Sequence, residues 1–275
     1  LGVDHPGLDQ DFFELGGHSL LAVRLFARIH KDFGLDLELS TLLVAGTVRK
    51  LASVVRTELK LPEPGSEPVR SVAAKKGQYV VPIQTAGRRP KLFLVHGAGG
   101  NVLGFRDLAH YFGKDQPVFG LQARGVDGKQ TPHQSIPEMA AAYLAELREV
   151  QPHGPYFLGG YSGGGVVAFE MAQLLREVGE PVAYIGLIDS LCPQMPRRTK
   201  ASRLAALMMR MVKGGPAYPI EVIKGKLQRR AAARRNEEAR REGGVMPQAL
   251  RGEEVQFAFE RAFLQHEVKP IEARL

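Results

Sequence analysis

The chain has 275 residues, 44% of them apolar, which allows one large domain or a small and a medium one. It contains no apolar run of membrane-spanning length and no signal peptide, so we expect a cytoplasmic protein that does not enter a membrane. The single cysteine, Cys192, excludes an internal disulfide framework, and no Cys or His spacing suggests a metal site.

The net charge of +8 comes from one segment. Residues 197–242 hold fourteen Lys or Arg against four Glu, a local charge of +10, so the rest of the chain is about −2. This segment lacks the interleaved aromatic residues or finger-like spacing of a nucleic-acid reader. We expect a solvated helical face there and no nucleic-acid partner.

Helical periodicity begins at Leu20. Apolar residues recur every three or four positions until Gly34, and a second helical pattern runs from Val48 to Leu59. Ser19, directly before the first helix, is predicted to be its N-cap.

The stretch from Phe12 to Leu20, FFELGGHSL, resembles the attachment site of the peptidyl carrier domains of non-ribosomal peptide synthetases. The resemblance implies that the Ser19 hydroxyl carries 4'-phosphopantetheine, rather than only capping a helix. It also implies a phosphopantetheinyl transferase and upstream synthetase modules, including a condensation domain, as partners. The family's proline before Thr47 is replaced by Gly46, and its first helix is missing, so we expect residues 1–58 to be an incomplete carrier domain.

A proline-rich segment, residues 59–78, reads as a tether between domains. After it, strands alternate with helices, which predicts a parallel sheet covered on both faces. The expected strands are 80–83, 92–95, 117–121, 156–158 and 182–188. The expected helices are 105–112, 135–150 and 166–178, the second opened by a capping box at Ser135.

A Gly-x-Ser-x-Gly pattern, residues 160–164, falls where a strand turns into a helix. This is the context of a nucleophile elbow, in which glycines let the backbone pass while the Ser162 hydroxyl projects above the sheet. The alternative is an ordinary glycine-rich turn.

Asp189 ends the next strand and is the candidate acid of a Ser, Asp, His triad, with a turn-capping aspartate as the alternative. The candidate oxyanion donors are the backbone amides of Gly163 and Ala98. His96 precedes the acid in the chain and belongs to the oxyanion loop, so we do not expect it to be the base.

Together, the elbow and the flanking stretches VHGAGG (95–100), GLQA (120–123), AFEMA (168–172) and LIDS (187–190) resemble the type I thioesterase domains of peptide and polyketide synthases. The resemblance implies a helical-bundle carrier followed, over residues 79–275, by an α/β-hydrolase domain with a lid at about 194–265. The family's last strand and helix are missing. His266 reads as the end of a lid helix, so we expect the catalytic histidine to lie beyond Leu275.

The implied function is release of an acyl or peptidyl thioester. The acyl or peptidyl group held at Ser19 would be transferred to Ser162 and released by hydrolysis or macrocyclisation. The alternative is a carrier and docking module with an inactive hydrolase domain. We read the face of Met208 and Met211 as lid packing, with the lining of a substrate channel as the alternative. The basic residues 224–241 suit an anionic acyl chain or a partner carrier, and the sequence does not favour either.

Overall fold

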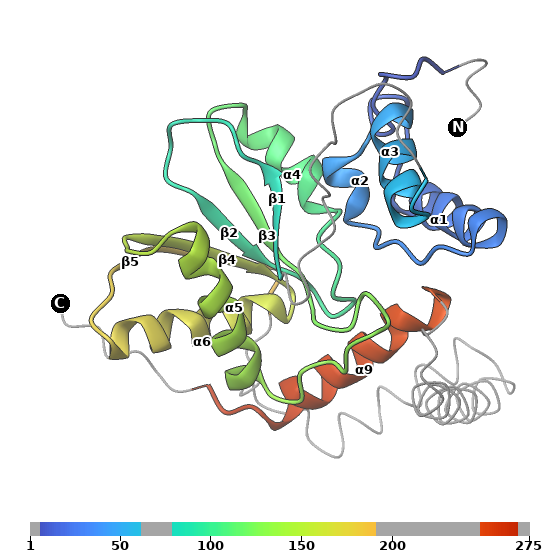
Figure 1. Cartoon of the computed structure of the whole chain (residues 1–275). Helices are drawn as coiled ribbons and strands as arrows, with labels where there is room; N and C mark the ends of the chain where they lie inside the picture. The colour runs from blue at the N-terminus through green and yellow to red at the C-terminus, as the bar shows by residue number, and fades with distance from the viewer. Residues whose placement is uncertain (1–5, 62–78, 191–247, 269–275) are drawn as a thin grey trace, which may run out of the picture.

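The computed structural model describes residues 6–61, 79–190 and 248–268 (Figure 1). It begins with three helices, α1 (Ser19–Phe33), α2 (Thr41–Val44) and α3 (Val48–Glu58). These helices form the N-terminal unit, residues 6–61, and the remaining described residues form the sheet unit. Residues 62–78 of the predicted tether, the basic segment and the methionine face lie outside the described residues.

Helix α1 buries the apolar face that the sequence predicts. Ala22, Phe26 and Ile29 are buried on one face, and the helix ends at Gly34, whose φ of +67° belongs to the left-handed region that glycine adopts without cost. The predicted N-cap is wrong by one residue, because the N-cap is His18 and Ser19 is the first helical residue. The four residues of α2 were not predicted, since so short a helix shows no period.

Five strands form one sheet in the order β1-β3-β2-β4-β5. They are β1 (Val80–Gln84), β2 (Leu92–Val95), β3 (Val118–Leu121), β4 (Tyr156–Tyr161) and β5 (Val182–Ile188). Strands β2 to β5 are parallel, as expected, but β1 pairs antiparallel with β3. The prediction of an all-parallel sheet is therefore wrong at this strand, because alternation of apolar residues does not reveal strand direction.

Helices cover both faces of the sheet (Figure 1). In β2, Phe93 and Val95 pack in a core with α5 (Ile136–Val150) and α6 (Gly164–Glu177), whereas Leu94 packs on the other face with α4 (Phe105–Phe112). This alternation is the two-residue period of a strand buried on both sides. Among the described strands β5 lies at one end of the sheet, and its residues Tyr184 and Leu187 are exposed.

One further helix, α9 (Gln248–Gln265), packs along the sheet unit. Its residues Val255, Phe259 and Ala262 are buried at helical spacing, and the last two belong to the core shared with α5 and α6. Within residues 6–61, 79–190 and 248–268, no helix is both long and apolar enough to cross a membrane.

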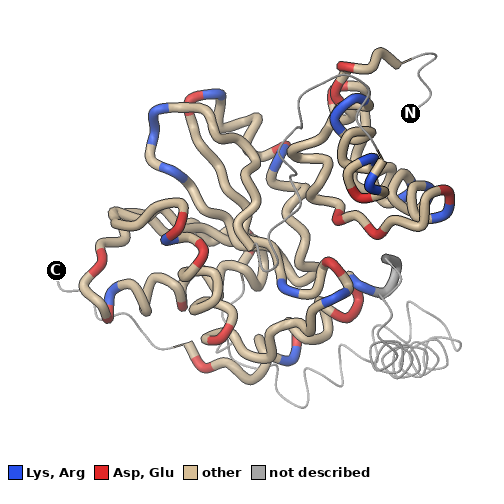
Figure 2. The backbone as a smooth tube through the Cα atoms, in the orientation of Figure 1, with Lys and Arg blue, Asp and Glu red and all other residues tan. Residues whose placement is uncertain are grey.

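The two units contact one another. Leu103, just before α4, is buried with Ala22 and Phe26 of α1. Ion pairs join Arg106 to Asp11 at 3.1 Å and Arg251 to Asp36 at 2.6 Å. In the part of the chain that Figure 2 colours, acidic and basic residues are intermixed.

Candidate active site

Ser162 lies at the turn between β4 and α6 and has a φ of +53°. A left-handed conformation is uncommon for a residue with a Cβ and costs on the order of 1 kcal/mol or more, so its presence points to a functional constraint. The glycine pattern explains how the turn is built. A Cβ at Gly160 would overlap the backbone of Gly164, and a Cβ at Gly164 would overlap the carbonyl of His96. The elbow predicted from the sequence is present.

Asp189 is next to this turn. Tyr161 pairs with Ile188, so the residues that follow them, Ser162 and Asp189, leave the sheet side by side. The Ser162 amide donates to the Ile188 carbonyl at 2.8 Å. Asp189 also has a positive φ, +48°, and its side chain is exposed. The structure thus brings together the predicted nucleophile and acid at the carboxyl edge of the sheet.

The candidate oxyanion donors are also available. The amides of Gly163 and Ala98 donate to no acceptor among the described residues. Gly163 is buried at the N-terminus of α6, where the helix dipole favours negative charge. Because buried amides are almost always bonded, an open one beside a strained serine suggests a place for a substrate oxygen.

His96 is fully buried at the end of β2 and both of its ring nitrogens are engaged. Nε2 lies 2.6 Å from the Tyr143 hydroxyl, and Nδ1 lies 2.5 Å from the Gly97 carbonyl oxygen. Burial lowers the pKa of His96 to about 4, so its ring is neutral near pH 7. Both ring nitrogens therefore bond to groups in the protein interior, and neither bonds to Ser162.

His266 follows the end of α9, as the sequence indicated. Its Nε2 lies 3.4 Å from a carboxylate oxygen of Glu170 on α6, and its side chain is almost fully buried. This contact ties the end of α9 to the elbow helix. Among the described histidines, neither His96 nor His266 is bonded to Ser162 or Asp189.

Phe259 of α9 covers the elbow. Its ring occupies the space where a Cβ of Gly163 would lie, and its centroid is 5.6 Å from that of His96. Neither Phe259 nor Tyr143 is predictable as a site residue from the sequence. Both residues belong to ordinary apolar helical patterns. The one available signal is His96, because a polar residue at the end of a buried strand needs partners around its ring.

Ser19 is exposed at the start of α1, and its hydroxyl makes no hydrogen bond within the described part of the chain. A free hydroxyl beside a helix N-terminus suits a phosphodiester, whose negative charge the dipole favours. The described residues therefore fit phosphopantetheine at Ser19. They show no cluster of three His, Cys, Asp or Glu side chains that would hold a metal ion.

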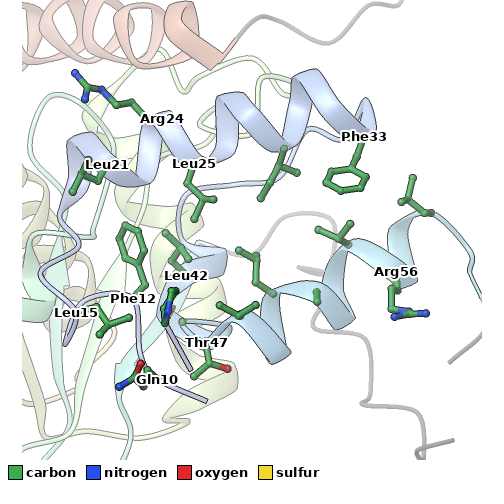
Figure 3. A pocket seen from close by; sticks show the side chains of 18 of the residues that line it. Gln10, Phe12, Leu15, Leu21, Arg24, Leu25, Phe33, Leu42, Thr47 and Arg56 are labelled. Atoms are coloured by element: carbon green, nitrogen blue, oxygen red, sulfur yellow. The ribbon is translucent and has the colours of Figure 1, made fainter. Parts of the chain in front are cut away.

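A groove of about 770 Å³ opens between α1 and α3 in the N-terminal unit (Figure 3). Its walls are mainly apolar and include Leu21, Leu25, Phe33 and Val55. All of its lining residues come from residues 6–61, so it is separate from the elbow. This lining favours packing rather than chemistry.

A serine at such a strand-to-helix turn is typical of the α/β-hydrolase fold, and the sheet, its helices and the elbow place this chain in that fold class. The chain belongs to the thioesterase domain family, whose model matches residues 90–259. A second model, described as a phosphopantetheine attachment site, matches residues 1–55. The carrier and thioesterase resemblances are therefore confirmed.

Similar proteins are multidomain synthetases. Malpibaldin synthetase of Mortierella alpina is 41% identical over 192 residues, which cover 69% of this chain and 3% of that protein. A dimodular nonribosomal peptide synthase of Bacillus subtilis is 39% identical over 190 residues, 69% of this chain and 7% of its own length. A holo four-domain nonribosomal peptide synthetase, solved with AMP and glycine, is similar over 97% of this chain and 20% of its own, with 25% identity and a TM-score of 0.53. The chain thus spans a small part of each.

Proposed function

We propose that this chain is the carrier and chain-release end of a nonribosomal peptide synthetase. The observation that carries the proposal is the open, buried amide of Gly163 beside the strained Ser162, in the same chain as a phosphopantetheine attachment domain. The substrate class is an acyl or peptidyl thioester. Phosphopantetheine on Ser19 supplies the thiol that holds the acyl group.

In this reaction Ser162 Oγ attacks the thioester carbonyl carbon. The Gly163 and Ala98 amides stabilise the oxyanion, the C–S bond breaks, and the thiol leaves with the proton removed from Ser162. Water or a nucleophile within the acyl chain then releases the Ser162 ester. Asp189 orients and stabilises the protonated base.

The base is a histidine supplied by the longer synthetase. This assignment is supported by the commitment of His96 to Tyr143 and Gly97, and of His266 to Glu170. Without that histidine the present chain should cleave thioesters slowly, by a factor on the order of 10⁴ relative to the complete protein. The partners are the upstream modules, with a condensation domain, and a phosphopantetheinyl transferase, in the cytoplasm.

The test is to load Ser19 with an acyl-phosphopantetheine group and follow the thioester by mass spectrometry. In the complete synthetase the thioester should disappear, and in Ser162→Ala it should persist. Ser135→Ala, which removes only the hydroxyl that caps α5, serves as the matched control and should behave as the wild type. Failure of Ser19→Ala to load would assign the attachment site.

A second candidate is a carrier and docking module whose hydrolase domain is inactive. It is favoured by the absence, among the described residues, of an imidazole bonded to Ser162 or Asp189. Equal persistence of the thioester in the wild-type synthetase and in Ser162→Ala would support this candidate and contradict release.

A further inference from the structure

We propose that His96 and Tyr143 are positioning residues that orient the Gly97–Ala98 peptide and thereby aim the Ala98 amide at the oxyanion. This inference rests on the proposed function of the elbow. It starts from two hydrogen bonds in series, from Tyr143 to His96 and from His96 to the Gly97 carbonyl.

The direction of these bonds follows from chemistry. A carbonyl oxygen only accepts, so Nδ1 of His96 must carry the proton that it donates to Gly97. In a neutral ring Nε2 is then the acceptor, and the Tyr143 hydroxyl is its donor. Burial keeps the ring neutral by lowering its pKa to about 4, although the bond to Gly97 opposes this shift.

The bond to Gly97 fixes a peptide plane. The Gly97 carbonyl also accepts from the Gly100 amide at 2.9 Å, so two donors hold the same oxygen. In a trans peptide the C=O and the following N–H point in opposite directions. The Ala98 N–H therefore points away from both donors, and no described residue accepts it.

The chain of bonds is anchored in the core. Tyr143 is fully buried on α5, and its ring lies 5.4 Å from Tyr79 and 6.0 Å from His133, measured between centroids. The carbonyl of His96 in turn lies against Gly164 of the elbow. His96 thus links the oxyanion loop both to the core helix α5 and to the nucleophile turn. This arrangement keeps the oxyanion donors at fixed distances from the nucleophile.

The first measurement needs no activity. Nitrogen-15 NMR of the imidazole of His96 in this chain should show the Nδ1–H tautomer at pH 7. In Tyr143→Phe, the Nε2 resonance should shift because its donor is lost, and the Ala98 amide resonance should move with it. An Nε2–H tautomer in the wild type would overturn the proposal, because Nδ1 could not then donate to Gly97.

The second measurement uses the complete synthetase and the acyl thioester of a short free thiol. We expect Tyr143→Phe to lower kcat about 10-fold and to leave KM within about twofold. A misoriented Ala98 amide weakens stabilisation of the transition state more than it weakens substrate binding. Tyr156→Phe is the matched control. It removes another fully buried hydroxyl, one that donates to Pro152 at the opposite end of β4, and should leave kcat unchanged.

Two substitutions at His96 distinguish a loss of Ala98 amide orientation from a loss of folding. Asn can place a donor where Nδ1 lies, and Gln can reach only the position of Nε2. His96→Asn should keep kcat within about threefold, whereas His96→Gln should lose about 30-fold. Equal losses in the two variants, or a Tyr143→Phe loss no larger than that of Tyr156→Phe, would overturn the proposal. A wild-type synthetase without turnover would instead overturn the proposed function, leaving the NMR measurement to judge the hydrogen bonds.

Discussion

At the residue scale, two of the three non-glycine residues with positive φ in the described part of the chain lie at adjacent strand ends. These residues, Ser162 and Asp189, directly follow Tyr161 and Ile188, which pair with one another between β4 and β5. Each such conformation costs on the order of 1–3 kcal/mol, and the surrounding sheet must hold it in place. The site therefore depends on the rigidity of β4 and β5 as well as on its own side chains.

His96 makes the stability of the fold sensitive to acid. Its pKa is about 4 in the folded protein, because burial disfavours the charged ring, against about 6.5 when it is unfolded. Below pH 6.5 the unfolded chain binds a proton at this ring that the folded chain does not. The free energy of unfolding should therefore fall between pH 6.5 and 4, by on the order of 2–3 kcal/mol by pH 4.5.

Urea unfolding at pH 7 and pH 4.5 measures this loss in the wild type and in His96→Asn. The variant lacks the ring, so its loss should be smaller by about that amount. Asp9 and Glu180, whose pKa values are lowered by hydrogen bonds, also lose stabilisation as the pH falls, but they do so equally in both proteins. An identical pH dependence in the two proteins would contradict the assignment.

Some of the site could be predicted from the sequence and some could not. Ser162 was predictable because a tight strand-to-helix turn requires glycine at fixed positions around the nucleophile. The partnership of His96 and Tyr143 was not, because the two residues are 47 positions apart and meet only when the sheet and α5 pack. Phe259 was hidden for the same reason, since its neighbour Gly163 lies on another element.

At the element scale, α9 connects the two units and covers the elbow. Arg251 near its start pairs with Asp36 of the N-terminal unit, Phe259 lies over Gly163, and its C-terminal end is tied to α6 through His266. Figure 1 shows the helix reaching from the sheet unit toward the three N-terminal helices. The stability of α9 itself should therefore affect how the elbow is covered.

Gly252 is a weak point in this helix. It is exposed, and a Cβ there would meet no atom within 4 Å. Gly252→Ala should stabilise the protein by about 0.5–1 kcal/mol, because alanine loses less backbone entropy in a helix. Hydrogen exchange of the α9 amides should slow in this variant. Gly34→Ala is the contrasting control, since the positive φ of Gly34 should make the same change destabilising. No change in exchange along α9 would contradict the prediction.

The elements themselves were largely predictable. Both long helices of the N-terminal unit, and the helices of the sheet unit before Asp189, follow apolar periods that survive in the structure. The direction of β1 was not predictable, because a strand pattern is the same whichever way the strand runs. The partial exposure of β5 was also missed, since its apolar run reads as a buried strand although it lies at the edge of the sheet.

At the scale of the whole molecule, the contact between the two units combines a small apolar patch with opposite charges. Arg106 pairs with Asp11 and lies 4.3 Å from the centroid of the Phe13 ring, and Gln122 donates to Glu38 at 2.9 Å. The acidic partners come from the N-terminal unit and the basic ones from the sheet unit. Complementary charges of this kind fix register more than they add affinity. The sequence could not predict this contact, because its residues lie far apart in the chain.

The ion pair of Asp36 with Arg251 is more buried than the pair of Asp11 with Arg106 and offers the sharpest test of this contact. Arg251 is 3% exposed, and its guanidinium lies 2.6 Å from a carboxylate oxygen of Asp36, which also faces His30 at 3.3 Å. Asp36→Asn removes the carboxylate charge from this ion pair, so the contact between the units should weaken by about 1–3 kcal/mol. Energy transfer between dyes on α3 and α5 should then report a larger mean separation. Asp9→Asn makes the same charge change at the exposed pair with Arg49 inside the N-terminal unit and should leave the separation unchanged. If both variants keep the wild-type transfer efficiency, the pair does not hold the units together, and the apolar patch around Leu103 must do so instead.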